Sequence, residues 1–128
     1  MNLRAWVDGP FRDSGTVDPT LRASVGSMQR LAFEKPPFDR ALAPHEPLVP
    51  PASGRLAELR MPVLVILGAL DAPDVNAIGE RVGREVPHAT VERWPDVGHM
   101  LPMERPDAFA ERVLRFLDER GGDRPAPA

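Results

Sequence analysis

The sequence predicts an α/β fold in which residues 62–120 form a βαβα unit of a parallel sheet. The run VLVIL at residues 63–67 is continuously aliphatic, with no alternating polar residue. Such a run is typical of a strand covered on both faces, as strands in parallel sheets are. A second strand pattern follows at residues 90–94, and helical periodicities come after each strand. The order strand, helix, strand, helix with a right-handed crossover is the signature of an open α/β sheet.

The first strand leads through the loop GALDAPD, residues 68–74, into a helical pattern. Apolar residues then recur on one helical face, at Val75, Ile78, Val82 and Val86. Asp74 is the predicted N-cap of this helix, because a short acidic side chain accepts hydrogen bonds from the first free N–H groups. Pro87 ends the pattern.

The second strand, TVERW at residues 90–94, alternates in polarity and suits a less covered position near a sheet edge. The turn at residues 95–98 then carries His99. Pro106 opens the last predicted helix and Gly121 stops it. The apolar face of this helix consists of Phe109, Val113, Phe116 and Leu117.

The first sixty residues contain no run that predicts a buried strand. Asp18 and Pro19 predict a capped helix that extends to about Glu34. Its apolar stripe consists of Leu21, Val25, Met28 and Leu31. A proline-rich connection occupies residues 35–51, and Ser53 is expected to cap a short helix over residues 54–59. The chain thus divides into a helical and connecting segment, 1–61, the βαβα unit, 62–120, and a disordered tail, 121–128.

The composition excludes several classes of function. The 128 residues suit one domain, and the net charge of −3 without a Lys/Arg stripe argues against nucleic-acid binding. No apolar stretch is long enough to cross a bilayer, and no signal peptide follows Met1, so no membrane partner is expected. The chain has no cysteine, which fits a cytoplasmic location, and three scattered histidines. No metal site and no cofactor are therefore expected.

Two residues stand at positions where chemistry is expected. Asp71 and His99 each follow the carboxyl end of a predicted strand, and in open α/β sheets those ends share one ligand crevice. His99 also lies in an apolar loop, where a structural histidine with one satisfied hydrogen bond is the alternative. The nearby carboxylate of Asp71 favours the functional interpretation. His45 and His88 are expected at the surface.

The segments PVLVILGALDAPD and VERWPDVGHMLPMERPDAFAERVLRFL resemble the C-terminal portion of an α/β-hydrolase. The family pattern is a strand followed by G-x-x-D, and later a G-H loop followed by E-x-P and a closing helix. RAWVDGPFR and PPASGRLAELRMP also resemble the end of that family's helical cap and its return to the core. The resemblance implies a partial α/β-hydrolase fold: the C-terminal βαβα unit of a parallel sheet, preceded by helical cap-like segments. It also implies hydrolysis of an ester, lactone or similar acyl bond, as in esterase and lactonase relatives.

By this resemblance Asp71 is the acid of a catalytic triad and His99 its general base and acid. Asp74 is the competing acid, but its position suits a helix cap better. The family's nucleophile on a G-x-S-x-G elbow is missing, and so is the oxyanion-hole segment. RASVG at residues 22–26 comes nearest to an elbow. It starts with Arg22 and reads as mid-helix, so Ser24 is not expected to be a nucleophile.

Two functions remain open at this stage. In the first, the chain is the C-terminal part of a hydrolase, inactive alone, and a missing N-terminal half supplies a serine or, for dehalogenase or epoxide hydrolase chemistry, an aspartate. In the second, it is a non-enzymatic, degenerate hydrolase fragment that acts as a binding or interaction module. Either way, the strand at residues 63–67 has an edge and apolar faces that must meet the missing half or a second copy.

Overall fold

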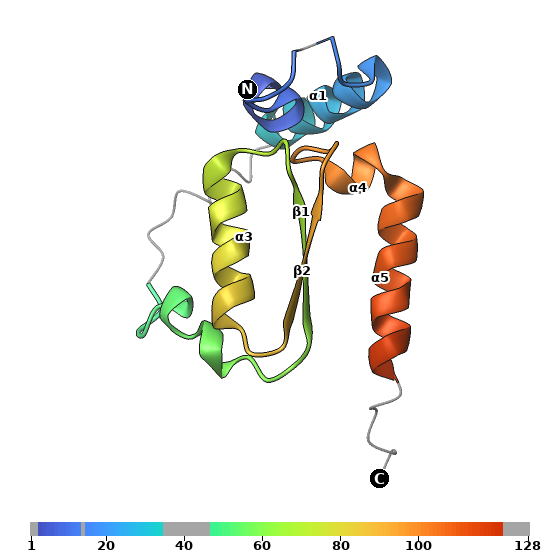
Figure 1. The fold of residues 1–128 in the computed structure, drawn as a ribbon. Helices are drawn as coiled ribbons and strands as arrows, with labels where there is room; N and C mark the ends of the chain where they lie inside the picture. Colours follow the sequence, from blue (N-terminus) through green and yellow to red (C-terminus); the bar gives the residue numbers. More distant parts are fainter. Residues whose placement is uncertain (1–2, 14, 35–46, 122–128) are drawn as a thin grey trace.

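The computed structural model describes residues 3–13, 15–34 and 47–121. At its centre, β1 (Val63–Gly68) and β2 (Ala89–Trp94) pair in parallel, with Val63 opposite Ala89 and Gly68 opposite Trp94. Helix α3 (Pro73–Glu85) connects the two strands, and α5 (Pro106–Gly121) follows the second. The two helices lie on opposite sides of the sheet (Figure 1). The predicted βαβα unit is confirmed.

Helix α3 packs on the sheet through small residues together with part of the predicted aliphatic stripe. Val75 and Val82 are half-buried, and Val86, directly after the helix, is buried. Asn76 and Gly79 are buried, whereas Ile78 is 65% exposed. A Cβ at Gly79 would lie 3.3 Å from Cγ of Leu67 and closer still to one of its methyl groups. The missing side chain lets the helix backbone approach the strand.

The prediction that Asp74 is the N-cap of this helix is wrong. The helix begins at Pro73, with Ala72 as N-cap and no side-chain cap hydrogen bond, so Asp74 lies within the first turn. Proline suits the first helical position because its fixed φ matches the helix and its missing N–H would have no partner there.

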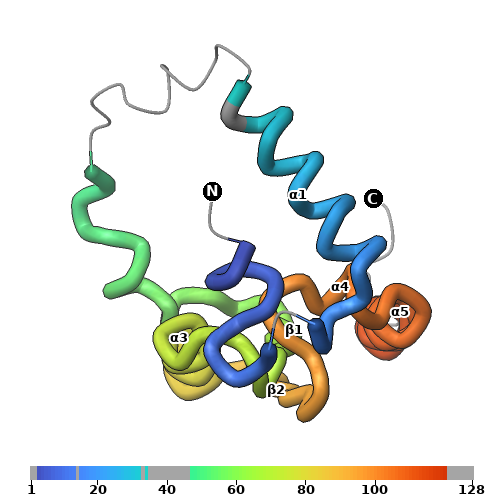
Figure 2. The backbone as a smooth tube through the Cα atoms, turned by 90° about the horizontal axis from the view of Figure 1, so that it is seen from above, coloured from blue at the N-terminus to red at the C-terminus, as the bar shows by residue number. Residues whose placement is uncertain are grey.

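The segment before the sheet forms a layer over the carboxyl ends of both strands (Figures 1 and 2). It consists of η1 (Arg4–Asp8), a single π-helical turn, and α1 (Pro19–Glu34). Asp18 caps α1 as predicted, since its Oδ1 accepts the Leu21 N–H at 2.9 Å. Val7, Val17 and Val25 form the core of this layer. Met100 and Met103 pack against it from the segment after β2 that carries His99, residues 95–104, which we call the histidine loop.

The short helix expected over residues 54–59 is replaced by two 3-10 turns, η2 (Ala52–Gly54) and η3 (Leu56–Glu58). Ser53 lies inside the first turn and makes no cap. Arg55 separates the turns with φ −120° and ψ 13°, a conformation that an α-helix cannot continue through. Residues 35–46 of the predicted connection and residues 122–128 of the predicted tail lie outside the described residues.

Strand β1 is less covered than its sequence predicts. Its first four residues are only half-buried, and only Leu67 and Gly68 are buried. Leu114 and Leu117 on α5 are 60% and 56% exposed, although Leu117 was expected on the buried face. None of the helices in the described ranges is long and apolar enough to span a membrane.

The ends of the two strands meet in a contact that only glycine permits. A Cβ added at Gly68 would lie 2.6 Å from the carbonyl oxygen of Val97 and nearer still to that of Gly98. The contact is reinforced by the Leu70 N–H, which donates to the Val97 carbonyl at 3.0 Å. The loops that follow β1 and β2 are therefore held directly against each other.

We expect Gly68→Ala to lower the free energy of unfolding by about 1–3 kcal/mol, because backbone carbonyls must move to admit the methyl group. Urea unfolding followed by far-UV circular dichroism measures this. Gly54→Ala is the matched control, since a Cβ there meets nothing within 4 Å. The control should leave stability unchanged or raise it by up to about 1 kcal/mol. Equal losses in both variants would contradict the strand-end contact.

Candidate active site

Asp71 lies in the turn between β1 and α3, directly beyond the carboxyl end of the strand. Its N–H donates to the Gly68 carbonyl at 3.1 Å, which closes the turn. One carboxylate oxygen, Oδ1, accepts the Ala72 N–H at 2.7 Å. The residue is only 5% exposed, so this carboxylate is fixed by the backbone and largely shielded from solvent.

Asn76 holds the same turn from the first part of α3. Its Nδ2 donates to the Gly68 carbonyl at 3.1 Å and more weakly to that of Asp71 at 3.5 Å. Asn76 is itself buried. The turn that carries the carboxylate is thus tied both to the strand before it and to the helix after it.

His99 lies in the loop after β2 and reaches the same place from the second strand. Its Nδ1 is 2.9 Å from Oδ2 of Asp71, which is hydrogen-bonding distance. The predicted pairing of these two side chains is therefore confirmed as geometry. The imidazole is 35% exposed, so it is neither the buried histidine of the structural alternative nor fully solvated.

One side of the imidazole faces an aromatic ring. The indole of Trp6, in η1, lies with its ring centroid 4.7 Å from that of His99, at an interplanar angle of 56°. A cavity of about 480 Å³ opens beside this pair. It is lined by Trp6, Val25, Met28, Gln29, Ala32, His99 and Met100. Apart from Gln29 and His99 itself, the lining is apolar.

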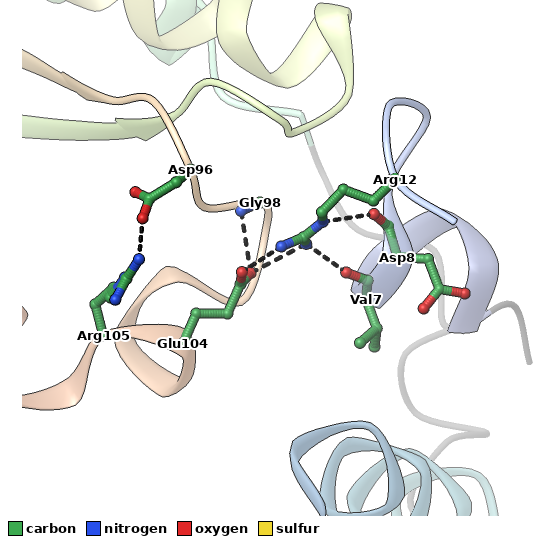
Figure 3. Close-up of polar contacts among 7 residues, drawn as sticks. All are labelled: Val7, Asp8, Arg12, Asp96, Gly98, Glu104 and Arg105. Carbon is green, nitrogen blue, oxygen red and sulfur yellow. Dashed lines mark hydrogen bonds and ion pairs between the residues drawn. The ribbon is translucent and has the colours of Figure 1, made fainter. Parts of the chain in front are cut away.

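The Gly98 backbone, directly before His99, is held by an ion pair between Glu104 and Arg12 (Figure 3). Glu104 lies at the end of α4 (Leu101–Glu104), a short helix that the sequence did not predict. Its Oε1 accepts the Gly98 N–H at 3.0 Å, and its carboxylate pairs with the guanidinium of Arg12. The histidine loop is therefore attached to the segment that precedes α1.

A second ion pair stabilises that segment from within. The carboxylate of Asp8 is fully buried and accepts hydrogen bonds from Arg22 at 3.1 and 3.3 Å. The hydrogen bond to Asp8 is the main cause of a raised pKa for Arg22. The pair joins η1 to α1 and leaves no buried charge there without a partner.

The other residues considered from the sequence do not join this site. Asp74 is exposed in the first turn of α3, and Asp71 occupies the position beside His99. His88 is exposed at the opposite end of the sheet, before β2. Ser24 is exposed in the middle of α1. His45 lies outside the described residues. Within the described ranges, no three His, Cys, Asp or Glu side chains gather as a metal site would require.

Three residues that hold or face the histidine loop were missed from the sequence: Trp6, Arg12 and Glu104. Glu104 stood inside the E-x-P pattern that carried the resemblance, and Trp6 and Arg12 inside the cap-like segment. Their contacts with the histidine loop depend on how the first segment folds over the strands. No local periodicity in the sequence encodes that placement.

The profile of the alpha/beta hydrolase family matches residues 2–112 of the chain. A stretch of 61 residues is 36% identical to the pimeloyl-[acyl-carrier protein] methyl ester esterase of Pectobacterium atrosepticum, covering 48% of this chain and 24% of that protein. A stretch of 63 residues is 29% identical to the uncharacterised hydrolase YugF of Bacillus subtilis, covering 49% and 23%.

Polyketide synthase ThaQ of Burkholderia thailandensis is 37% identical over 68 residues, which cover 53% of this chain and 3% of that protein. Each match spans less than a quarter of the relative's length. No solved structure matches the chain at a significant level. Because the family profile extends over most of the residues, the chain belongs to the alpha/beta hydrolase family, as its G-x-x-D and G-H segments predicted.

Proposed function

We propose that Asp71 and His99 are the acid and the histidine of a catalytic triad that hydrolyses an ester, lactone or similar acyl bond. The observation that carries this proposal is the 2.9 Å contact between His99 Nδ1 and a buried carboxylate oxygen of Asp71. A triad needs this arrangement, because the histidine must present one nitrogen to a carboxylate and keep the other for the nucleophile.

The two residues divide the work. The Ala72 N–H orients one oxygen of Asp71, and the second oxygen accepts the Nδ1–H of His99. This fixes the imidazole tautomer, so that Nε2 is the unprotonated nitrogen that takes a proton from the nucleophile. The imidazolium formed is then stabilised by the carboxylate beside it. His99 returns the proton to the leaving group, as general acid.

The nucleophile in this proposal comes from outside the chain, on a missing N-terminal half. Ser24 does not suit the role, because it lies on an exposed helix face and not on a turn between a strand and a helix. A serine or an aspartate could occupy the position beside His99. The name of the esterase relative favours acyl chemistry, and hence serine.

The apolar cavity beside His99 supports a substrate whose acyl or alcohol part is uncharged. Five of its lining residues offer only carbon, sulfur or indole surface: Trp6, Val25, Met28, Ala32 and Met100. A charged group placed against this lining would give up part of its hydration and find only Gln29 and His99 as polar partners. We therefore expect an apolar ester or lactone to bind better than a carboxylated one.

In the chain joined to the half that carries the nucleophile, His99→Ala should abolish turnover by the triad and leave only the residual rate that binding and the oxyanion hole provide. Asp71→Asn should lower kcat by up to about 10⁴, the scale that loss of the orienting carboxylate has in other triads. Asp74→Asn is the matched control and should leave kcat unchanged, because Asp74 is exposed and Asp71 occupies the position beside His99. Release of an aryl alcohol from a simple ester measures all three. An unchanged kcat in Asp71→Asn would show that another group supports His99.

The chain on its own should not hydrolyse an aryl ester above the buffer rate, because an acid–base pair without a nucleophile and oxyanion hole has nothing to activate. It should also self-associate, since β1 has a strand partner on one edge only among the described residues and Leu114 and Leu117 are exposed. Light scattering and an esterase assay test both points. A monomer whose esterase activity disappears in Ser24→Ala would contradict the proposal. Failure of the joined enzyme to turn over any ester would favour the binding module instead.

A further inference from the structure

The carboxylate of Glu104 is nearly buried and bridges two partners. Its Oε1 accepts the Gly98 N–H at 3.0 Å and Nη2 of Arg12 at 3.2 Å, and its Oε2 accepts from Nη1 of Arg12. The Arg12 and Glu104 side chains are only 8% and 10% exposed. A charge as shielded as this needs its partner, so the pair holds a single geometry.

Arg12 is in turn fixed to the backbone of the first segment. Its Nη2 also donates to the Val7 carbonyl at 2.7 Å, and its Nε donates to the Asp8 carbonyl at 2.9 Å (Figure 3). Val7 and Asp8 are both fully buried. The guanidinium therefore fixes Glu104 relative to the buried turn that contains Val7 and Asp8.

Gly98 is confined by this pair and by the strand end. A Cβ on Gly98 would collide with the Arg12 guanidinium, and the Gly98 carbonyl lies against Gly68 on its other side. Its N–H is held by Glu104. With three sides of Gly98 fixed, the Cα of the next residue, His99, has little freedom. This explains why a glycine directly precedes the histidine.

We propose that Arg12 and Glu104 are positioning residues for His99: their buried ion pair holds the Gly98 backbone so that the imidazole meets Asp71. The inference rests on the proposed hydrolase function for its significance, but its geometry can be tested without turnover. Neither Arg12 nor Glu104 touches the reacting atoms. Both act through the backbone of Gly98.

The decisive variant is the double substitution Arg12→Leu/Glu104→Leu. Replacing both members of a buried pair by apolar side chains of similar size tends to preserve stability, whereas removing one leaves a buried charge without a partner. The double variant should therefore keep the fold without a buried unpaired charge, at a cost in stability, because the Gly98 N–H loses its acceptor and the Val7 and Asp8 carbonyls lose their donor. Arg12→Lys is the second variant. It keeps the charge but cannot form the forked contacts that Arg12 makes with Glu104 and two carbonyls.

The readouts are the ring ¹⁵N spectrum of histidine-labelled protein, dissolved or sedimented, and hydrogen exchange at the Gly98 amide. The signals that disappear in His45→Gln and His88→Gln are assigned to those two rings. Asp71→Asn gives the reference spectrum of a His99 ring without its carboxylate partner. In the wild type we expect the Nδ1-protonated pattern. In both variants we expect the Asp71→Asn pattern, and exchange at Gly98 faster by about tenfold, as for loss of one charge-assisted hydrogen bond.

Asp96→Asn/Arg105→Gln is the control, because it removes an exposed ion pair beside the same loop. That ion pair makes no polar contact with Gly98. It should leave both readouts unchanged. The proposal is wrong if a variant that keeps wild-type helical content also keeps the wild-type ring spectrum and the wild-type exchange rate at Gly98. Since neither readout measures ester hydrolysis, failure of the hydrolase proposal in the joined enzyme would be seen separately.

Discussion

The contact between the ends of the two parallel strands is the constraint on which the site depends. Gly68 has no side chain, so the carbonyls of Val97 and Gly98 approach its Cα directly. Parallel pairing alone would place both loops at one edge of the sheet, at the usual strand spacing. The glycine contact brings them closer than a side chain would allow. The 2.9 Å distance between Asp71 and His99 is a consequence of that approach.

The acid and the histidine are supported in different ways. Asp71 depends on its own βα turn, through hydrogen bonds that involve Gly68, Ala72 and Asn76. The histidine loop depends on a distant part of the chain, because its methionines pack against the core of the first segment and its Glu104 pairs with Arg12. The cap-like segment thus supports the candidate site, and it also lines the cavity beside the imidazole.

Sequence patterns predicted both strands, the helices α1, α3 and α5, and the central pair, because these are encoded locally: an aliphatic run, a helical period, and polar residues directly after strand ends. They failed where close packing determines which residues of a helix are buried and which distant segments touch. The predicted apolar stripe of α3 holds only in part: Ile78 is exposed, whereas Gly79 and Gly83 lie against the sheet, where a Cβ at Gly83 would collide with Val91. The roles of Arg12 and Trp6 could not be predicted, since each contacts a loop more than eighty residues away in the chain.

The proposed triad requires that Asp71 act only through His99. A double-mutant cycle on kcat, in the chain joined to the proposed nucleophile-bearing half, tests this requirement. We expect strong non-additivity: once His99 is alanine, adding Asp71→Asn should leave the residual rate unchanged, because no imidazole remains to be oriented. If Asp71→Asn lowers the rate by the same factor with and without His99, the carboxylate has an independent role and the two residues do not form a triad.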